Sequence, residues 1–135
     1  MLHLAICDKS LNDIEQMEKY LENIKFFNFD YEVFENAKEL YKYQTQHHEN
    51  FDIYILSIEL EDMLGLEVAR KLREDSQEAL IIFVSNDAKC VFDVFEVFTF
   101  AFLLKPLTYN KFSTTLYNAF NYLYRNFISD FWLSA

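Results

Sequence analysis

Five short apolar runs alternate with five longer segments of helical periodicity, and no other feature constrains the fold of this chain as strongly. The run 80–84 (LIIFV) is continuously apolar, which is typical of a strand buried on both faces of a sheet. Between residues 11 and 24, apolar residues recur three or four positions apart and so line one helix face. Because parallel strands need crossover connections, the alternation predicts an α/β fold with a doubly wound, five-stranded parallel sheet and five helices.

The same patterns give the expected elements. Ser10, followed three residues later by Asp13, is typical of a helix start. We interpret residues 1–127 as one domain and residues 128–135 as a tail or the start of a linker to a missing effector domain. The expected strands are Leu2–Cys7, Phe29–Phe34, 52–56, 80–84 and Ala101–Leu104, and the expected helices are 11–24, 36–47, 64–74, 88–98 and 109–127.

Length and composition exclude several classes of protein. The chain has 135 residues, 52% of them apolar, which suits one domain with a filled core. Its single glycine, Gly65, excludes the dinucleotide fingerprint and the Walker loop, because both need at least two glycines near phosphate. A net charge of −10 disfavours direct binding of nucleic acid by this domain. No apolar run approaches the roughly 18 residues of a membrane span, so no membrane contact is predicted.

The cysteines and histidines form no metal-binding pattern. Cys7 and Cys90 lie far apart in the sequence, so we interpret them as lone thiols in a reducing compartment and expect a cytoplasmic protein. His47 and His48 are adjacent and lack the four-residue spacing that directs two histidines to one ion, which favours solvated surface. No metal site is predicted.

Polar side chains stand where four of the expected strands end. In doubly wound folds, the carboxyl ends of the strands form the functional site. Proline after the last strand fixes the backbone at that point. The candidate site residues are Asp8 and Lys9 after the first strand, Ser57 after the third, Ser85 after the fourth, and Lys105 and Pro106 after the fifth.

This pattern of strand ends, over residues 1–127, resembles the receiver domains of two-component response regulators. The resemblance implies a flavodoxin-like fold in which two acids after the first strand hold Mg²⁺. It also implies an Asp after the third strand that accepts a phosphoryl group from a histidine kinase, with Ser or Thr and Lys-Pro completing the pocket. Residues 95–107 (FEVFTFAFLLKPL) resemble the LytTR-type branch, whose full-length members carry a DNA-binding domain after the receiver.

Two departures from the family pattern affect the same chemistry. Ser57 stands at the phosphoacceptor position, and a serine hydroxyl is a poor nucleophile without a base to activate it. Lys9 replaces the second metal-binding acid. At about 4 Å and an effective dielectric of about 20, two unit charges interact by about 4 kcal/mol, so Lys9 opposes a divalent ion. We therefore expect a degenerate pocket without metal or cofactor, in which Ser57 is a small neutral filler and Ser85 is either a pocket residue or only a hydrogen-bonding loop residue.

Charge counting suggests how such a pocket is balanced. Asp8, Lys9, Ser57 and Lys105 together carry a formal charge of +1, so the pocket is neutralised without a metal. In this hypothesis Lys9 takes the space of the missing ion, and Asp8 bridges Lys9 and Lys105. The alternative is that Lys9 points to solvent.

The favoured function is that of a pseudo-receiver, a regulatory and non-enzymatic domain that acts through protein contacts and controls any effector that follows it. Ten of the fifteen phenylalanines lie at or after Phe83, so some aromatic rings are expected at the surface. We expect a homodimer through the face between Ala88 and Phe127, and contacts with a histidine kinase or another signalling protein.

Two other functions stay open at this point. One is a working receiver that takes its phosphoryl group on another carboxylate, such as Glu59 or Asp62. The other is a pocket that senses a small anion, attracted by Lys9 and Lys105.

Overall fold

The computed structural model describes the backbone of residues 1–134 and the side chains of residues 1–126. Five parallel strands form one sheet in the order β2-β1-β3-β4-β5. The strands are β1 (Leu2–Cys7), β2 (Phe29–Phe34), β3 (Ile53–Ser57), β4 (Leu80–Ser85) and β5 (Ala101–Leu104). The helices are α1 (Leu11–Glu22), α2 (Ala37–His47), α3 (Gly65–Asp75) and α4 (Tyr109–Ser134), with two short 3-10 helices, η1 (Ala88–Phe92) and η2 (Phe95–Val97).

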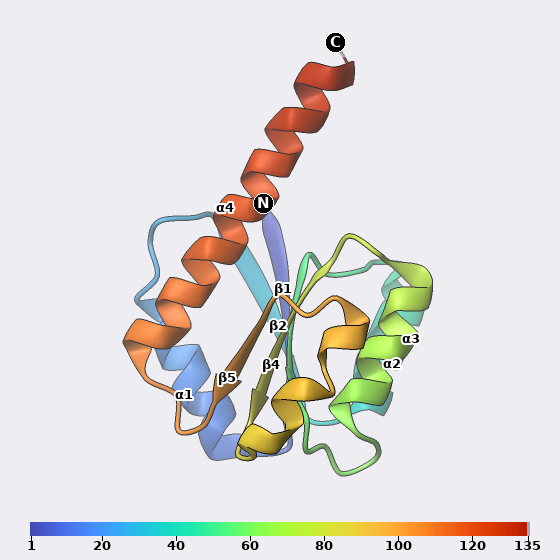
Figure 1. The fold of residues 1–135 in the computed structure, drawn as a ribbon, viewed down its shortest axis with the longest axis vertical. Helices are drawn as coiled ribbons and strands as arrows, with labels where there is room; N and C mark the ends of the chain where they lie inside the picture. The colour runs from blue at the N-terminus through green and yellow to red at the C-terminus, as the bar shows by residue number, and fades with distance from the viewer. Residues whose placement is uncertain (135) are drawn as a thin grey trace.

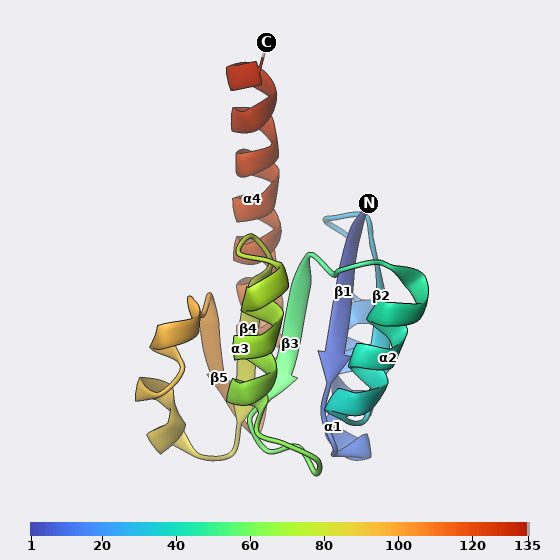
Figure 2. The same ribbon diagram turned by 90° about the vertical axis from the view of Figure 1, so that its right-hand side faces the viewer.

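Helices cover both faces of the sheet, as Figures 1 and 2 show. The core between the sheet and the helices α1 and α4 contains Met17, Phe112 and Phe120, all fully buried. The core on the other face contains Leu40 of α2 and Val68 of α3. Every residue of β3 and β4 is buried, because these central strands have helices on both sides. The doubly wound parallel sheet of a flavodoxin-like fold is therefore confirmed.

The predicted helix over residues 88–98 is wrong, because this segment forms the two 3-10 helices η1 and η2. The sequence from Val91 to Thr99 repeats a Val-Phe-polar triplet three times, VFD-VFE-VFT. A 3-10 helix has about three residues per turn, so a three-residue repeat places all members of one type on one side. Val94 and Val97 face the core, whereas the phenylalanines of the repeat are exposed. The described chain thus has four α-helices where five were expected.

The last helix is longer than predicted. The pattern indicated an end at residue 127, but α4 continues to Ser134. The backbone of residues 128–134 is therefore helical, and Ala135 and the side chains after residue 126 lie outside the described residues. The role of 128–135 as a tail or linker stays a prediction. Within the described part of the chain, no helix has both the length and the apolar character needed to span a membrane.

The two cysteines are free thiols. Cys7 is fully buried beneath the site, and burial raises the pKa of its thiol to about 12. Cys7 therefore stays protonated at neutral pH and serves as a small apolar core residue.

Candidate functional site

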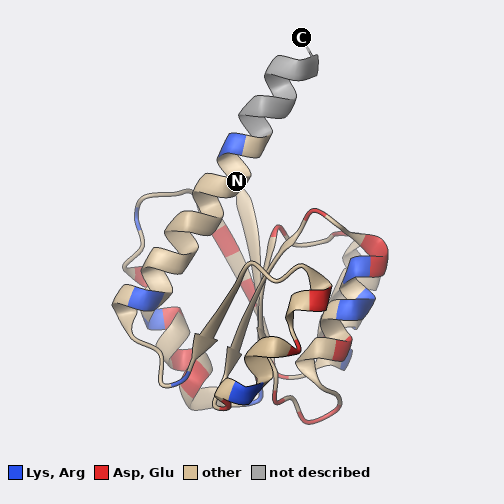
Figure 3. Ribbon diagram, in the orientation of Figure 1, with Lys and Arg blue, Asp and Glu red and all other residues tan. Residues whose placement is uncertain are grey.

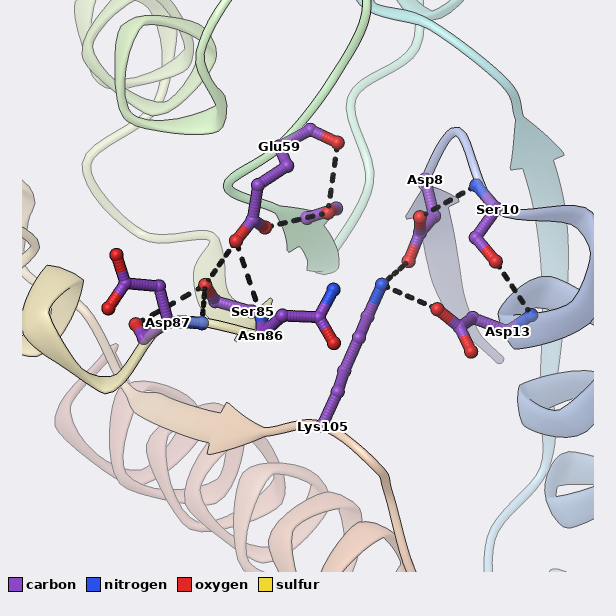
Figure 4. Close-up of polar contacts among 9 residues, drawn as sticks. Asp8, Ser10, Asp13, Glu59, Ser85, Asn86, Asp87 and Lys105 are labelled. Atoms are coloured by element: carbon purple, nitrogen blue, oxygen red, sulfur yellow. Dashed lines mark hydrogen bonds and ion pairs between the residues drawn. The ribbon is translucent and has the colours of Figure 1, made fainter.

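The register of the sheet brings four predicted site residues to one edge. Ser57 is the last residue of β3 and pairs with Val84, and Ser85 is the last residue of β4 and pairs with Leu104. Asp8 and Lys105 directly follow β1 and β5. The side chains of Asp8, Ser57, Ser85 and Lys105 are all buried at this edge. The polar contacts form two neighbouring groups, and Figure 4 shows Asp8 and Lys105 in one and Ser85 in the other.

The first group is centred on the Lys105 ammonium. Its Nζ donates to Asp8 Oδ2 at 2.8 Å and to Asp13 Oδ2 at 2.8 Å. The other oxygen of Asp8 accepts the backbone N–H of Ser10 at 3.0 Å. Burial alone would lower the pKa of Lys105, but the hydrogen bonds to Asp13 and Asp8 outweigh this effect and raise it. Lys105 is therefore a buried, fully charged cation held between two carboxylates.

Lys9 does not take part in this group. Its side chain is exposed, and among the described residues it forms no hydrogen bond or ion pair. The hypothesis that Asp8 bridges Lys9 and Lys105 is wrong, because Lys9 points to solvent and Lys105 instead bridges Asp8 and Asp13.

Asp13 could have been found from the sequence. The Ser10 hydroxyl accepts the Asp13 N–H at 3.3 Å, so the predicted start of α1 is confirmed. This cap places Asp13 in the first helical turn, directly after the loop that follows β1. A carboxylate at that position faces the strand ends, where Lys105 completes the ion pair.

The second group is centred on the Glu59 carboxylate, two residues after β3. Its Oε1 accepts the Ser85 hydroxyl at 2.6 Å and the Asn86 backbone N–H at 3.3 Å. Its Oε2 lies 3.5 Å from the Ser57 hydroxyl, which also contacts the Glu59 backbone oxygen at 3.3 Å. Ser85 in turn accepts the backbone N–H of Asp87 at 3.0 Å. Ser85 therefore belongs to the polar cluster at the strand ends and also orders the loop.

These contacts change the expected charge of the site. The predicted charge of +1 counted Lys9 and omitted Asp13 and Glu59. The two groups instead contain three carboxylates and one ammonium, so their formal charge is negative. The sequence named Glu59 only as an alternative phosphoacceptor and not among the candidate site residues, because it lies two positions past the strand and reaches back through its long side chain.

Asp62 is engaged elsewhere. Its carboxylate accepts the backbone N–H groups of Ala37 at 3.2 Å and Lys38 at 3.0 Å, at the start of α2. Burial opposes ionisation of Asp62, but the backbone hydrogen bonds dominate and lower its pKa. Pro106 follows Lys105 through a cis peptide bond and is exposed.

A family model described as the response regulator receiver domain matches residues 4–117. The chain belongs to the response regulator receiver family. Receiver domains are regulatory domains of two-component signalling, and they interact with kinases and other signalling proteins. Among curated protein sequences, none matches this chain significantly.

Solved receiver domains share the fold. The response regulatory domain of mrkE from Klebsiella pneumoniae superimposes with a TM-score of 0.81 at 14% identity, over 92% of this chain and 99% of that one. TrrA from Thermotoga maritima, in complex with Mg²⁺ and BeF, gives a TM-score of 0.74 at 22% identity, over 88% and 99%. CheY in the CheX complex from Borrelia burgdorferi gives a TM-score of 0.75 at 22% identity, over 88% of this chain and 89% of that one. At these identities the likeness shows the fold alone.

The donor set of this receiver domain does not fit a resident Mg²⁺ ion. Magnesium prefers several hard oxygen ligands with free lone pairs. Both oxygens of the buried Asp8 already accept hydrogen bonds, one of them from an ammonium. The second acid position is Lys9, and Ser57 offers a neutral hydroxyl in place of a carboxylate. In the described part of the chain, no cluster of three metal-ligating side chains is present.

Proposed function

We propose that this receiver domain is a pseudo-receiver, which regulates through protein contacts without accepting a phosphoryl group at Ser57. The observation that carries the proposal is the Lys105 ammonium, which lies 2.8 Å from both Asp8 and Asp13. This cation binds Asp8 directly and so competes with a divalent ion for that carboxylate. The proposal is tested directly by exposure to a phosphodonor, after which the mass of the protein should be unchanged.

The environment of Ser57 supports the same proposal. Its hydroxyl is buried, and its polar contacts within the described part of the chain are with the backbone oxygen and the carboxylate of Glu59, at 3.3 and 3.5 Å. A carboxylate is a weak base toward a hydroxyl at neutral pH, and this one accepts its shorter hydrogen bond from Ser85. Ser57 therefore lacks both the charge of an aspartate and an effective base. We propose no enzymatic activity and no cofactor for this domain.

The absence of metal dependence is a testable part of the proposal. Millimolar Mg²⁺ should shift the melting temperature of the protein by less than about 1 °C relative to KCl of matched ionic strength. Binding with a Kd ten times below the Mg²⁺ concentration would raise the melting temperature by about 3–5 °C. Differential scanning calorimetry distinguishes these outcomes, and the larger rise would contradict the proposal.

An aromatic surface supports action through protein contacts. Phe92, Phe95 and Phe98, which we call the aromatic ridge, are 79%, 66% and 71% exposed. The neighbouring β5 carries no charged residue, and between residues 109 and 126 the helix α4 carries only Lys111 and Arg125 (Figure 3). Asp93 and Glu96 lie between the rings in the sequence, but exposed aromatic clusters are typical of interface centres. We propose that this face, from residue 88 to 127, forms a homodimer.

The dimer has a direct test. Sedimentation equilibrium at about 100 µM, well above the micromolar range of transient contacts, should give twice the monomer mass without any phosphodonor. The double variant Phe92→Ala and Phe95→Ala should weaken association at least about tenfold, because these rings supply most of the ridge area. Leu11→Ala, which removes an exposed apolar residue from α1, is the matched control and should leave association unchanged. A wild-type monomer at this concentration would exclude the dimer.

The cellular setting is part of the same proposal. Residues 95–107 resemble the LytTR-type branch, so we propose a cytoplasmic regulator in which the domain precedes a DNA-binding effector and contacts a histidine kinase or another signalling protein. The apolar character of residues 128–135 supports a continuation beyond residue 127 into a linker or a contact segment.

A further inference from the structure

We infer that Glu59 is a positioning residue for η1 and for the start of the aromatic ridge. Its carboxylate holds this segment in place by accepting the hydroxyl of Ser85. The inference rests on the proposed function, because it explains how the ridge is ordered without phosphorylation. Its basis is the contact of the Glu59 carboxylate with the Ser85 hydroxyl, at 2.6 Å. A distance this short is typical of a hydroxyl that donates to an ionised carboxylate.

The contact continues from Ser85 into η1. The Ser85 hydroxyl accepts the Asp87 N–H at 3.0 Å, and the Asp87 side chain accepts the Lys89 N–H at 2.9 Å. The Asp87 backbone oxygen then accepts the Cys90 N–H at 3.2 Å. Glu59 also accepts the Asn86 N–H at 3.3 Å. A chain of hydrogen bonds therefore connects the Glu59 carboxylate to the first turn of η1. Figure 4 shows the first part of this chain, from Glu59 through Ser85 to Asp87.

Hydrophobic packing provides little attachment for η1. None of its residues is buried, and Phe92 at its end is 79% exposed. A segment with few buried apolar contacts has a low free energy of local opening unless polar contacts restrain it. The bridge from Glu59 to Ser85 and Asp87 is the polar restraint at this end of the segment.

The other half of the segment is attached differently. Val94 and Val97 are buried in the core, and Arg73 of α3 donates to the backbone oxygens of Val97 at 2.8 Å and Phe98 at 3.0 Å. These contacts do not involve Glu59. The segment from residue 86 to 98 therefore has two attachments. One is the contact of Glu59 with Ser85, and the other combines the buried valines, the Arg73 hydrogen bonds and the ion pair between Arg70 and Glu96. Loss of Glu59 should loosen only the first half.

Hydrogen exchange of the whole chain tests this division. In Glu59→Ala, the amides of Asp87, Cys90 and Asp93 should exchange at least about tenfold faster than in the wild type. The amides of Val97 and Phe98 should change less than about twofold. Glu59→Gln should give a smaller acceleration, because the amide oxygen can still accept the Ser85 hydroxyl but carries no charge.

Glu61→Ala is the matched control, since it removes an equal charge from an exposed position in the same loop. The amides of this variant should exchange at the wild-type rates.

Two outcomes would overturn the inference. One is that the amides of residues 87–93 exchange at the same rates in Glu59→Ala and Glu61→Ala. The other is that Glu59→Ala accelerates exchange evenly over residues 86–98. If Glu59→Ala does not fold, Ser85→Ala removes the same bridge and should give the same pattern. The measurement uses neither Mg²⁺ nor a phosphodonor, so its failure is distinct from a failure of the proposed function.

Discussion

Replacement of Lys105 by methionine is expected to destabilise the protein by about 3–5 kcal/mol, because it leaves a buried carboxylate without its cation. The side chains of Lys105 and Asp8 are only 5% and 1% exposed. Methionine has nearly the volume of the lysine stem, so the loss comes from charge and not from a cavity. Urea unfolding monitored by circular dichroism measures the effect as a shift in the midpoint.

Two further variants separate charge from packing. Asp13→Asn should destabilise the protein less than Lys105→Met does, because the Asp13 side chain is 33% exposed and Lys105 keeps Asp8 as its partner. The double variant Lys105→Met and Asp8→Asn should recover part of the loss, since the uncompensated buried charge is gone. A Lys105→Met protein within about 1 kcal/mol of the wild type would contradict the assignment of a buried ion pair.

The stability contributed by Lys105 should also depend on pH in a defined direction. The pKa of Lys105 in the folded protein is raised above the ordinary value of 10.5. A raised folded pKa means that the contribution is fully present below 10.5 and is lost as the pH rises through the folded pKa. The difference in stability between the wild type and Lys105→Met should therefore hold from neutral pH to about 10 and decrease only above that.

Gly65→Ala is expected to destabilise the protein by about 3 kcal/mol or more, because there is no room for a side chain at the start of α3. A Cβ atom at Gly65 would lie 2.1 Å from the backbone oxygen of Ser57. The Gly65 N–H also donates to Ile58 O at 2.9 Å, which fixes the close approach of the two segments. The end of β3 would have to move to make room for the Cβ atom. This movement would disturb the contacts between Ser57 and Glu59.

Thermal unfolding measures this change, with Glu67→Ala as its control. Glu67 is an exposed residue in the same first turn of α3, and its replacement should cost no more than about 1 kcal/mol. Equal melting temperatures for the two variants would show that the backbone contact between Gly65 and Ser57 is not as close as described.

Periodicity predicted the sheet and four of the five expected helices, because burial on two faces leaves a direct pattern in the sequence. The run 80–84 and the helix face around Met17 are examples, and both lie in the core. The segment 88–98 was assigned the wrong type of helix. Its apolar residues recur every three positions, which fits a 3-10 helix with Val94 and Val97 inside, and valine and phenylalanine have low α-helix propensity.

The candidate site was predicted in part. Asp8, Ser57, Ser85 and Lys105 were identifiable because parallel strands end at one edge, so their position in the sequence determines their position in space. The direction of Lys9 and the reach of Glu59 depend on side-chain conformation beyond the strand ends, which alternation along a strand does not specify. The predicted start of α1 places Asp13 near the strand ends, but its pairing with Lys105 depends on how α1 packs against them.

The central claim is that this receiver domain does not accept a phosphoryl group. Intact-mass spectrometry after incubation with acetyl phosphate and Mg²⁺ tests it most directly. A variant carrying both Ser57→Asp and Lys9→Asp is the positive control, because it restores an ionised carboxylate at the acceptor position and a second acid beside Asp8. Ser57→Asp alone should respond incompletely, since Lys9 remains.

We predict that the mass of the wild type is unchanged, whereas the double variant gains one phosphoryl group that hydroxylamine removes. An equal, hydroxylamine-sensitive gain by the wild type would contradict the account. It would identify a working receiver that is phosphorylated on another carboxylate, such as Glu59 or Asp62, and peptide mapping of the modified protein would show which.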